Sequence, residues 1–307
     1  MTRRVFIDGA VGTTGLEIAD RLAGRGEFSL IALAEDRRKD DAARAEALNA
    51  ADFVILCLPD DAARAAVAMI DNPRTRVIDA SSAHRIADSW TYGFPEVVGR
   101  EAVAAAMRVS NPGCYPTGFI ALVAPLVKAG LLPADWPYTV HAVSGYSGGG
   151  KALIGRFEED GDIAFRAYGL DMGHKHVPEI TRLSGLVHAP VFAPAVIPAH
   201  RGMVVEVPLA LAAMPTAGSP EALRLCLADA YAGSPVVTVH DDAPRELLLR
   251  RSMQPSDRLD LYVFGSEDGS QARLVAVLDN LGKGASGAAV QNLNLMAGLP
   301  ETAGLVL

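Results

Sequence analysis

The stretch Val5-Phe6-Ile7-Asp8-Gly9-Ala10-Val11-Gly12-Thr13-Thr14-Gly15 decides the fold of the first part of the chain. A short apolar strand runs into three spaced glycines and then into a helix over residues 16–22. Such glycines permit a tight turn, close approach of a pyrophosphate to the backbone, and close packing of helix on strand. The stretch therefore predicts dinucleotide binding by Gly9, Gly12, Thr13, Thr14 and Gly15; the alternative is a plain glycine-rich turn.

Strand and helix patterns alternate through the first third of the chain. Apolar runs at 28–34, 53–58 and 77–78 predict further strands, and 61–70 predicts a helix. Alternation of this kind is typical of α/β proteins and predicts a Rossmann-type, doubly wound parallel sheet.

The residues after the second strand give conflicting signals about the cofactor. Glu35 and Asp36 stand about 20 residues past the glycines, where an acid binds the ribose of NAD. Arg37, Arg38 and Lys39 follow at once, and cations there suit a 2′-phosphate. These residues alone leave NAD and NADP open.

The pattern of predicted secondary structure changes after residue 114. Longer strand patterns predict an α+β domain with a mixed, largely antiparallel sheet. A helix is predicted to begin at Ser219-Pro220-Glu221, where Ser219 can act as the N-cap. Another helix is predicted over 286–297. The predicted strands are 138–143, 191–197, 203–211, 236–240, 259–264 and 273–278.

The run Ser110-Asn111-Pro112-Gly113-Cys114-Tyr115-Pro116-Thr117-Gly118 places a cysteine at the mouth of a predicted helix. Unpaired backbone N–H groups and the positive end of the helix dipole favour a thiolate there and suit an oxyanion. Cys57 and Cys226 lie in apolar or helical stretches and are interpreted as packing residues. Cys114 is thus the candidate nucleophile, against the alternative of an inert buried cysteine.

Two further loops carry polar groups suited to chemistry. Around the glycine run 145–151, Ser144, Gly145 and Ser147 form a candidate phosphate cradle, while Ala152, just after the run, excludes a magnesium-binding nucleotide loop. His174 and His176, with Glu179 three residues on, supply an acid/base. For the loop with Ser144 and Ser147, the alternative is a flexible connection. For the loop with the two histidines, the alternatives are surface histidines or half of a metal site.

Composition narrows the class of protein. The chain has 307 residues, a formal net charge of −8 and three cysteines. The sequence shows no basic stripe of the kind that binds nucleic acid and no apolar run long enough to span a membrane. It also shows no signal-peptide core. Few, odd-numbered cysteines indicate a reduced, cytoplasmic protein.

Six motifs in the same order resemble N-acetyl-γ-glutamyl-phosphate reductase, the phosphorylating semialdehyde dehydrogenase of arginine biosynthesis, in its short-form branch. The resemblance covers nearly the whole length. The six motifs are the stretches 9–15, 81–85 with 92–96, 111–116, 143–148, 173–180 and 279–285.

The resemblance implies NADPH-dependent reduction of N-acetyl-L-glutamyl 5-phosphate through a thioester on Cys114, with His174 or His176 as acid/base. We expect no metal. It implies a dinucleotide domain over 1–113, a catalytic domain over 114–279, and a loop and helix over 280–307 that return to the first domain. It implies a homodimer or homotetramer. The expected cofactor contacts, besides the glycine loop, are Arg37, Pro59, Asn280 and Gly282. The expected substrate or phosphate contacts are Ser82, Arg85, Asn111, Ser144, Gly145, Ser147 and Glu179.

Three rival interpretations remain. A related dehydrogenase would act on aspartyl phosphate or carrier-linked aminoadipyl phosphate. A metal-dependent hydrolase would use His174, His176 and Glu179. A dinucleotide-binding sensor would have no reactive thiol.

Overall fold

The computed structural model describes residues 2–242 and 244–307. The chain divides into two compact units, the first formed by residues 2–112 and 285–305, the second by 113–284 and 306–307. Residues 285–305, which include the C-terminal helix, belong to the first unit, whereas 280–284 belong to the second.

The first unit is built on a six-stranded, all-parallel sheet in the order β2-β1-β3-β4-β6-β5. The predicted doubly wound sheet is confirmed. The strands are β1 (Arg3–Asp8), β2 (Phe28–Ile31), β3 (Phe53–Leu56), β4 (Arg76–Asp79), β5 (Thr91–Tyr92) and β6 (Arg108–Ser110).

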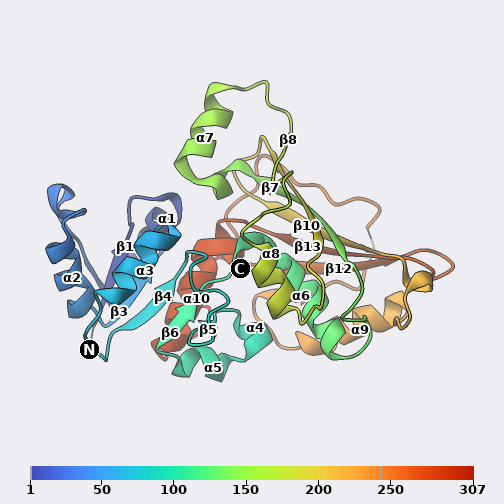
Figure 1. The fold of residues 1–307 in the computed structure, drawn as a ribbon, viewed down its shortest axis with the longest axis horizontal. Helices are drawn as coiled ribbons and strands as arrows, with labels where there is room; N and C mark the ends of the chain where they lie inside the picture. The colour runs from blue at the N-terminus through green and yellow to red at the C-terminus, as the bar shows by residue number, and fades with distance from the viewer. Residues whose placement is uncertain (1, 243) are drawn as a thin grey trace. The chain divides into compact units, whose positions relative to one another are not determined.

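Helices cover both faces of this sheet, and each face has its own apolar core. Ile18, Val103 and Leu293 belong to one core; Leu48 and Ala63 belong to the other. Figure 1 shows α10, in red, beside the strands of this unit, although it lies near the end of the chain. The helices are α1 (Thr13–Leu22), α2 (Asp41–Ala50), α3 (Asp60–Ala68), α4 (Pro95–Val98), α5 (Arg100–Ala105) and α10 (Gly287–Met296).

The second unit carries a seven-stranded mixed sheet in the order β11-β12-β13-β10-β7-β9-β8. Four of its six pairings are antiparallel, as the sequence predicted. The strands are β7 (Thr139–Gly145), β8 (Arg166–Ala167), β9 (Val191–Ile197), β10 (Met203–Leu209), β11 (Val237–Val239), β12 (Leu259–Gly265) and β13 (Ala272–Leu278).

Helix α6 (Cys114–Lys128) lies against β10 and β13 and is the most buried helix of this unit. Gly118 permits the approach, since a Cβ there would lie 2.8 Å from Val205 Cγ2. Helices α8 (Val177–Leu183) and α9 (Pro220–Ala230) contact α6, and α7 (Gly150–Glu159) lies between β7 and β8 along the chain (Figure 1). The sheet and α6 therefore fix the position of Cys114 at the N-terminus of a rigid helix.

Candidate active site

Cys114 is the first residue of α6, and its side chain is partly exposed. Gly113, in extended conformation, precedes it as the N-cap. Thr117 closes the first turn, because both its N–H and its hydroxyl donate to the Gly113 carbonyl at 2.9 Å. The thiol thus stands at the positive end of the helix dipole, where a negative charge on sulfur or on an attacked carbonyl oxygen is stabilised.

The turn before Cys114 is held by a buried carboxylate from α8. Glu179 is 1% exposed, and its Oε1 accepts a hydrogen bond from the Gly113 N–H at 2.8 Å. On another side Gly284 comes very close, since a Cβ there would lie 2.9 Å from Cys114 Cβ. The position of the thiol is therefore set by two segments distant in sequence.

An aromatic cluster surrounds Tyr115, the residue that follows Cys114. Its members are Tyr115, Tyr168, His174, His176 and Phe192. The His174 ring centroid lies 4.7 Å from that of His176 and 5.0 Å from that of Phe192. Tyr115, the residue after the cysteine, contacts both imidazoles, at 6.1 and 5.8 Å. The structure thus brings both predicted histidines to the residue that follows the thiol.

Burial in this cluster favours the neutral forms of His174, Tyr115 and Tyr168. Burial, with a smaller contribution from Lys175 and an opposing one from Asp171, lowers the pKa of His174 to about 4. Burial raises the pKa of Tyr168 to about 12 and that of Tyr115 well above its usual value. The Tyr168 hydroxyl donates to the Tyr115 oxygen at 3.2 Å, and the Tyr115 hydroxyl donates to the Ala195 carbonyl. At neutral pH the imidazole of His174 and both phenols are uncharged.

The glycine run after β7 is ordered rather than a flexible connection. Residues 146–149 form a 3-10 turn and Gly150 begins α7. The N–H groups of Gly145, Tyr146 and Ser147 donate to the carbonyls of Gly202, Ala199 and His200 respectively. These three N–H groups are engaged within the chain, so an anion at this loop would meet the two serine hydroxyls and the later glycines.

Asn280 connects that loop to the segment after β9. Its Nδ2 donates to Ser147 Oγ at 2.9 Å, and its Oδ1 accepts from the Gly202 N–H at 2.8 Å. Ser144 Oγ donates to the Gly145 carbonyl at 3.0 Å. Sequence reasoning assigned Asn280 to the cofactor; in the second unit its amide bonds the loop of the predicted phosphate contacts.

Arg201 is a charged group beside this loop, next to His200, whose carbonyl accepts from the Ser147 N–H. Its Nη1 lies 2.7 Å from Oδ2 of Asp279, which is fully buried. Gly282, also expected at the cofactor, is required by its surroundings, since a Cβ there would lie 1.8 Å from the Ser256 carbonyl oxygen. The spacing of these residues in the sequence carries no signal that Arg201 and Asp279 meet.

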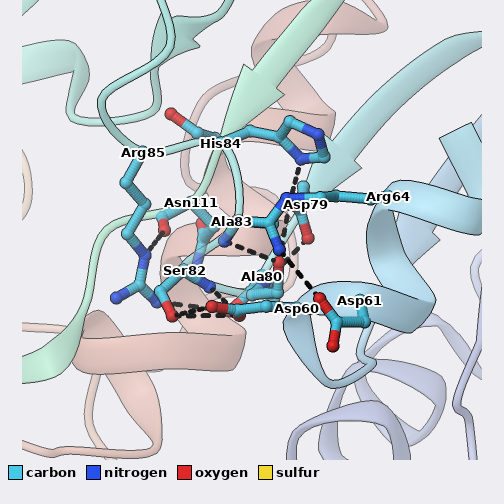
Figure 2. A network of polar contacts seen from close by, with 12 residues as sticks. Asp60, Asp61, Arg64, Asp79, Ala80, Ser82, Ala83, His84, Arg85 and Asn111 are labelled. Atoms are coloured by element: carbon cyan, nitrogen blue, oxygen red, sulfur yellow. Dashed lines mark hydrogen bonds and ion pairs between the residues drawn. The ribbon is translucent and has the colours of Figure 1, made fainter. Parts of the chain in front are cut away.

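The first unit gathers the predicted Ser82, Arg85 and Asn111 at the carboxyl ends of β4 and β6, as Figure 2 shows. The Ser82 hydroxyl contacts both oxygens of Asp60, at 2.9 and 2.8 Å. Arg85 donates to the carbonyls of Asn111 at 3.0 Å and Ala80 at 3.2 Å. These side chains tie the loop after β4 to its neighbours.

Buried Asp79 organises the same loop (Figure 2). Its carboxylate accepts from the N–H and hydroxyl of Ser81 at 2.9 and 2.8 Å, and its Oδ2 lies 2.6 Å from His84 Nδ1. The His84 ring stacks on Trp90 at 4.2 Å between centroids. His84 lies within the motif 81–85, and the sequence carried no signal that the buried Asp79 is its partner.

The glycine loop has the geometry that dinucleotide binding requires. Gly9 has φ +89°, and a Cβ there would lie 2.3 Å from the Cys57 carbonyl oxygen. A Cβ at Gly15 would lie 2.4 Å from the Gly9 carbonyl oxygen, so this glycine permits close packing of α1 on the turn. Gly12 is the N-cap of α1, Thr13 and Thr14 begin it, and Pro59 is the N-cap of α3.

A cavity of about 650 Å³ opens at the carboxyl ends of β1 and β2. Its lining includes residues 9–11, both acids Glu35 and Asp36, and the cations Arg38, Lys39 and Arg44. The Arg44 guanidinium bonds Oδ2 of buried Asp8 at 2.8 and 3.2 Å. Arg37 is not part of that lining, and its nearest acid is Glu46 at 4.0 Å. The glycine loop and this cavity fit the adenosine side of a dinucleotide.

Neither a metal cluster nor a membrane-spanning helix is found in the described ranges. Within residues 2–242 and 244–307, no three of His, Cys, Asp and Glu are grouped as metal ligands. In the same ranges no helix has the length and apolar character needed to cross a bilayer.

Comparison with known proteins places this geometry in a family. The chain matches the semialdehyde dehydrogenase NAD binding domain over residues 4–106 and the semialdehyde dehydrogenase dimerisation domain over 114–280. Over 308 residues it is 51% identical to N-acetyl-gamma-glutamyl-phosphate reductase 2 of Pseudomonas putida, covering 98% of each protein. It is 52% identical over 303 residues to N-acetyl-gamma-glutamyl-phosphate reductase of Burkholderia ambifaria, covering 96% of each.

Solved structures share the fold at low identity. Aspartate semialdehyde dehydrogenase II of Vibrio cholerae, complexed with ASA, aligns with a TM-score of 0.70 at 17% identity, over 97% of this chain and 99% of that one. Aspartate semialdehyde dehydrogenase of Candida albicans, with NADP, aligns with a TM-score of 0.63 at 15% identity, over 97% and 99%. The resemblance inferred from six short motifs is confirmed: the chain belongs to the N-acetyl-gamma-glutamyl-phosphate reductases of the semialdehyde dehydrogenase family.

Proposed function

We propose that the protein reduces N-acetyl-L-glutamyl 5-phosphate to N-acetyl-L-glutamate 5-semialdehyde with release of phosphate, a step of arginine biosynthesis. The observation that carries the proposal is a partly exposed thiol at the first residue of α6, followed in the chain by Tyr115, whose ring contacts two imidazoles. The named reductases that are half identical over nearly the full length support the choice of substrate.

The first half-reaction makes a thioester. The Cys114 thiol gives its proton to a histidine, His174 or His176, and the sulfur attacks the acyl carbon. Backbone N–H groups at the start of α6 stabilise the oxyanion. The C–O bond to phosphate breaks, the histidine returns the proton to the departing phosphate, and the acyl group remains on sulfur.

Ser144, Ser147 and Arg201 are proposed to hold the departing phosphate. The serines are buried at 2% and 1% exposure beside the loop that Asn280 fastens. Arg201 is oriented by Asp279. Glu179 is proposed to position the turn of Cys114 through its bond to Gly113. Ser82, Arg85 and Asn111 are proposed to shape the substrate side of the first unit.

The second half-reaction frees the aldehyde. When bound, NADPH supplies the hydride that reduces the thioester carbon. The tetrahedral thiohemiacetal anion then collapses, the C–S bond breaks, and the protonated histidine returns a proton to the Cys114 thiolate. One proton from solvent is consumed in each cycle, which balances the reaction.

NADP rather than NAD is the proposed cofactor. Arg38 and Lys39 line the cavity beside the second strand, where they suit a 2′-phosphate, while the Arg44 charge is already matched by Asp8. Gly9, Gly12, Thr13, Thr14 and Gly15 are proposed to receive the pyrophosphate. Further cofactor contacts are proposed at Pro59, Asn280 and Gly282. Arg37 is proposed as a more distant contact outside the cavity lining.

A cytoplasmic homodimer or homotetramer is the proposed assembly and location. The three cysteines are free thiols, as a reducing compartment maintains them. A match to a dimerisation domain over 114–280 supports self-association.

The test is an assay in the reverse direction. N-acetylglutamate semialdehyde should reduce NADP only when phosphate is present, and aspartate semialdehyde should react at least tenfold more slowly. Faster turnover of aspartate semialdehyde, or no need for phosphate, would overturn the proposal.

A further inference from the structure

Val306, near the C-terminus, is hydrogen-bonded to a buried acid of the second unit. Its N–H donates to Asp257 Oδ2 at 2.7 Å, and its carbonyl accepts from the Asp257 N–H, also at 2.7 Å. Asp257 is fully buried, and Val306 belongs to the same unit. A hydrogen bond to a carboxylate is roughly twice as strong as one between neutral groups. The main chain at Val306 and the acid are therefore held together at two points.

Asp257 lies in the segment 253–258, which forms neither helix nor strand. Its neighbour Ser256 lies against the loop after β13. The Ser256 N–H donates to Asp279 Oδ2 at 3.3 Å, and a Cβ at Gly282 would clash with the Ser256 carbonyl oxygen. A segment without regular structure makes few backbone hydrogen bonds within itself, so its place depends on contacts with other segments. The two bonds between Asp257 and Val306 therefore help to fix Ser256 beside Asp279.

The oxygen that Ser256 contacts is the one that orients Arg201. Arg201 Nη1 lies 2.7 Å from Asp279 Oδ2, the atom that also accepts from the Ser256 N–H. The other oxygen of Asp279 accepts from the Leu281 N–H at 2.9 Å. Because this carboxylate is fully buried and shared among its donors, a movement that breaks its bond to Ser256 also disturbs its bond to Arg201.

The segment 253–258 also packs against the residue that follows Arg201. A Cβ at Gly202 would lie 2.7 Å from Met253 Sδ, so the main chain passes very close to this side chain. The segment thus contacts the surroundings of Arg201 twice, at Gly202 and at Asp279.

Resting on the proposed function, we propose that Val306 and Asp257 are positioning residues for the departing phosphate. The two hydrogen bonds between them fix the segment 253–258. This segment fixes the carboxylate of Asp279, and the carboxylate orients the guanidinium of Arg201. Val306 and Asp257 act only through Arg201.

The defect expected from loss of these bonds is confined to one substrate. In the reverse direction the semialdehyde and NADP form the acyl-enzyme before phosphate attacks it. Loosening the segment 253–258 should therefore leave acyl-enzyme formation unchanged and weaken the use of phosphate.

A proline at position 306 has no N–H, so Val306→Pro removes the bond to the Asp257 carboxylate, whereas Val306→Ala keeps it. Val306→Pro should raise KM for phosphate by about 3–30-fold. It should leave KM for NADP, and the burst of NADPH before phosphate is added, as in wild type. Val306→Ala should match wild type throughout. An unchanged KM for phosphate in Val306→Pro, or an equal rise in KM for NADP, would overturn the proposal.

A double substitution separates positioning from a general loss of structure. Arg201→Gln has no guanidinium to orient, so adding Val306→Pro to it should change KM for phosphate by less than about twofold. An equal effect of the proline in both backgrounds would contradict the proposed route through Arg201.

Binding of inorganic phosphate to the resting protein, followed by 31P NMR, gives the same comparison without turnover. Val306→Pro should bind phosphate more weakly than wild type, and Val306→Ala should bind it equally well. Equal binding by all three proteins, or no binding by wild type, would overturn the proposal. If wild type binds phosphate and Val306→Pro binds it more weakly, but the semialdehyde is not turned over, the proposed function fails and the positioning of Arg201 stands.

Discussion

Replacing Gly284 by alanine tests how closely the position of Cys114 governs the rate. The added Cβ would lie 2.9 Å from Cys114 Cβ, 3.1 Å from the Asp279 carbonyl oxygen and 3.4 Å from Cys114 Cα. Carbon atoms prefer about 3.5–4.0 Å, so relief requires a shift of roughly 0.5–1 Å. Because two of the three contacts are atoms of Cys114, the nucleophile takes much of that shift.

The expected cost appears in the chemical step. Misplacing a reacting group by about 1 Å costs on the order of 10²-fold. We therefore expect Gly284→Ala to lower kcat by about 10–100-fold, and overpacking to lower the free energy of unfolding by about 1–3 kcal/mol. Steady-state NADPH oxidation and urea denaturation measure the two effects.

Gly155→Ala in α7 is the matched control. No heavy atom lies within 4 Å of the added Cβ there. Alanine in a helix interior should stabilise the protein by up to ~1 kcal/mol and leave kcat unchanged. If Gly284→Ala folds and keeps kcat within about twofold of wild type, the argument from close contact to rate is refuted.

Three further predictions concern the charged groups. Arg44→Met should lower the free energy of unfolding by about 3–5 kcal/mol because it leaves buried Asp8 unpaired, whereas Arg64→Met, at an exposed pair, should change it by less than ~1 kcal/mol; equal losses in urea denaturation would contradict this. Arg38→Ser with Lys39→Ser should raise KM for NADPH by about 10–100-fold and spare NADH, whereas Arg37→Ser, at an exposed outer contact, should raise KM for NADPH by less than about twofold; an equal rise for NADPH and NADH in the Arg38/Lys39 variant would count against a 2′-phosphate site. Because the pKa of His174 is lowered to about 4, the unfolded chain binds its proton first as pH falls below about 6.5, so stability declines from pH 6.5 to 4. After solvent screening this amounts to about 1–2 kcal/mol, which His174→Gln should lack in urea denaturation across that range; an unchanged pH dependence would refute it.

Local patterns in the sequence predicted much of the fold. The strand, glycine turn and helix over 5–22 could be read directly, because each glycine is required by a short-range contact, as at Gly9 and Gly15. The helix start at Cys114 was predicted for the same reason, since Gly113 and Pro116 are local signals. The alternation of strands and helices was enough to give the parallel sheet.

Two helices whose sequences carry weak helix signals were not predicted. Helix α7 begins at Gly150, and the glycines before it indicated a loop. Helix α2 is rich in alanine and has few apolar residues to mark a buried face, although its cap Asp40 accepts from the Ala43 N–H. In both cases packing against the rest of the unit overrides a weak local preference.

The aromatic cluster could not be predicted, because its members meet only through the fold. Tyr115 begins α6, Tyr168 follows β8, and Phe192 lies on β9. Strands β9 and β7 pair in parallel, and β8 adds to the far edge of β9. The sequence therefore indicated that His174 and His176 were chemically useful, while the burial that lowers the pKa of His174 depends on contacts from three distant segments.

The acyl-enzyme is the most direct test of the account, because every step proposed here passes through a thioester on Cys114. The protein is mixed with N-acetylglutamate semialdehyde and NADP without phosphate, then quenched. The account predicts a burst of NADPH equal to the enzyme concentration, with an N-acetylglutamyl group on the peptide that contains Cys114, and rapid release when phosphate is added. No burst and no adduct, or the same burst from Cys114→Ala, would contradict it.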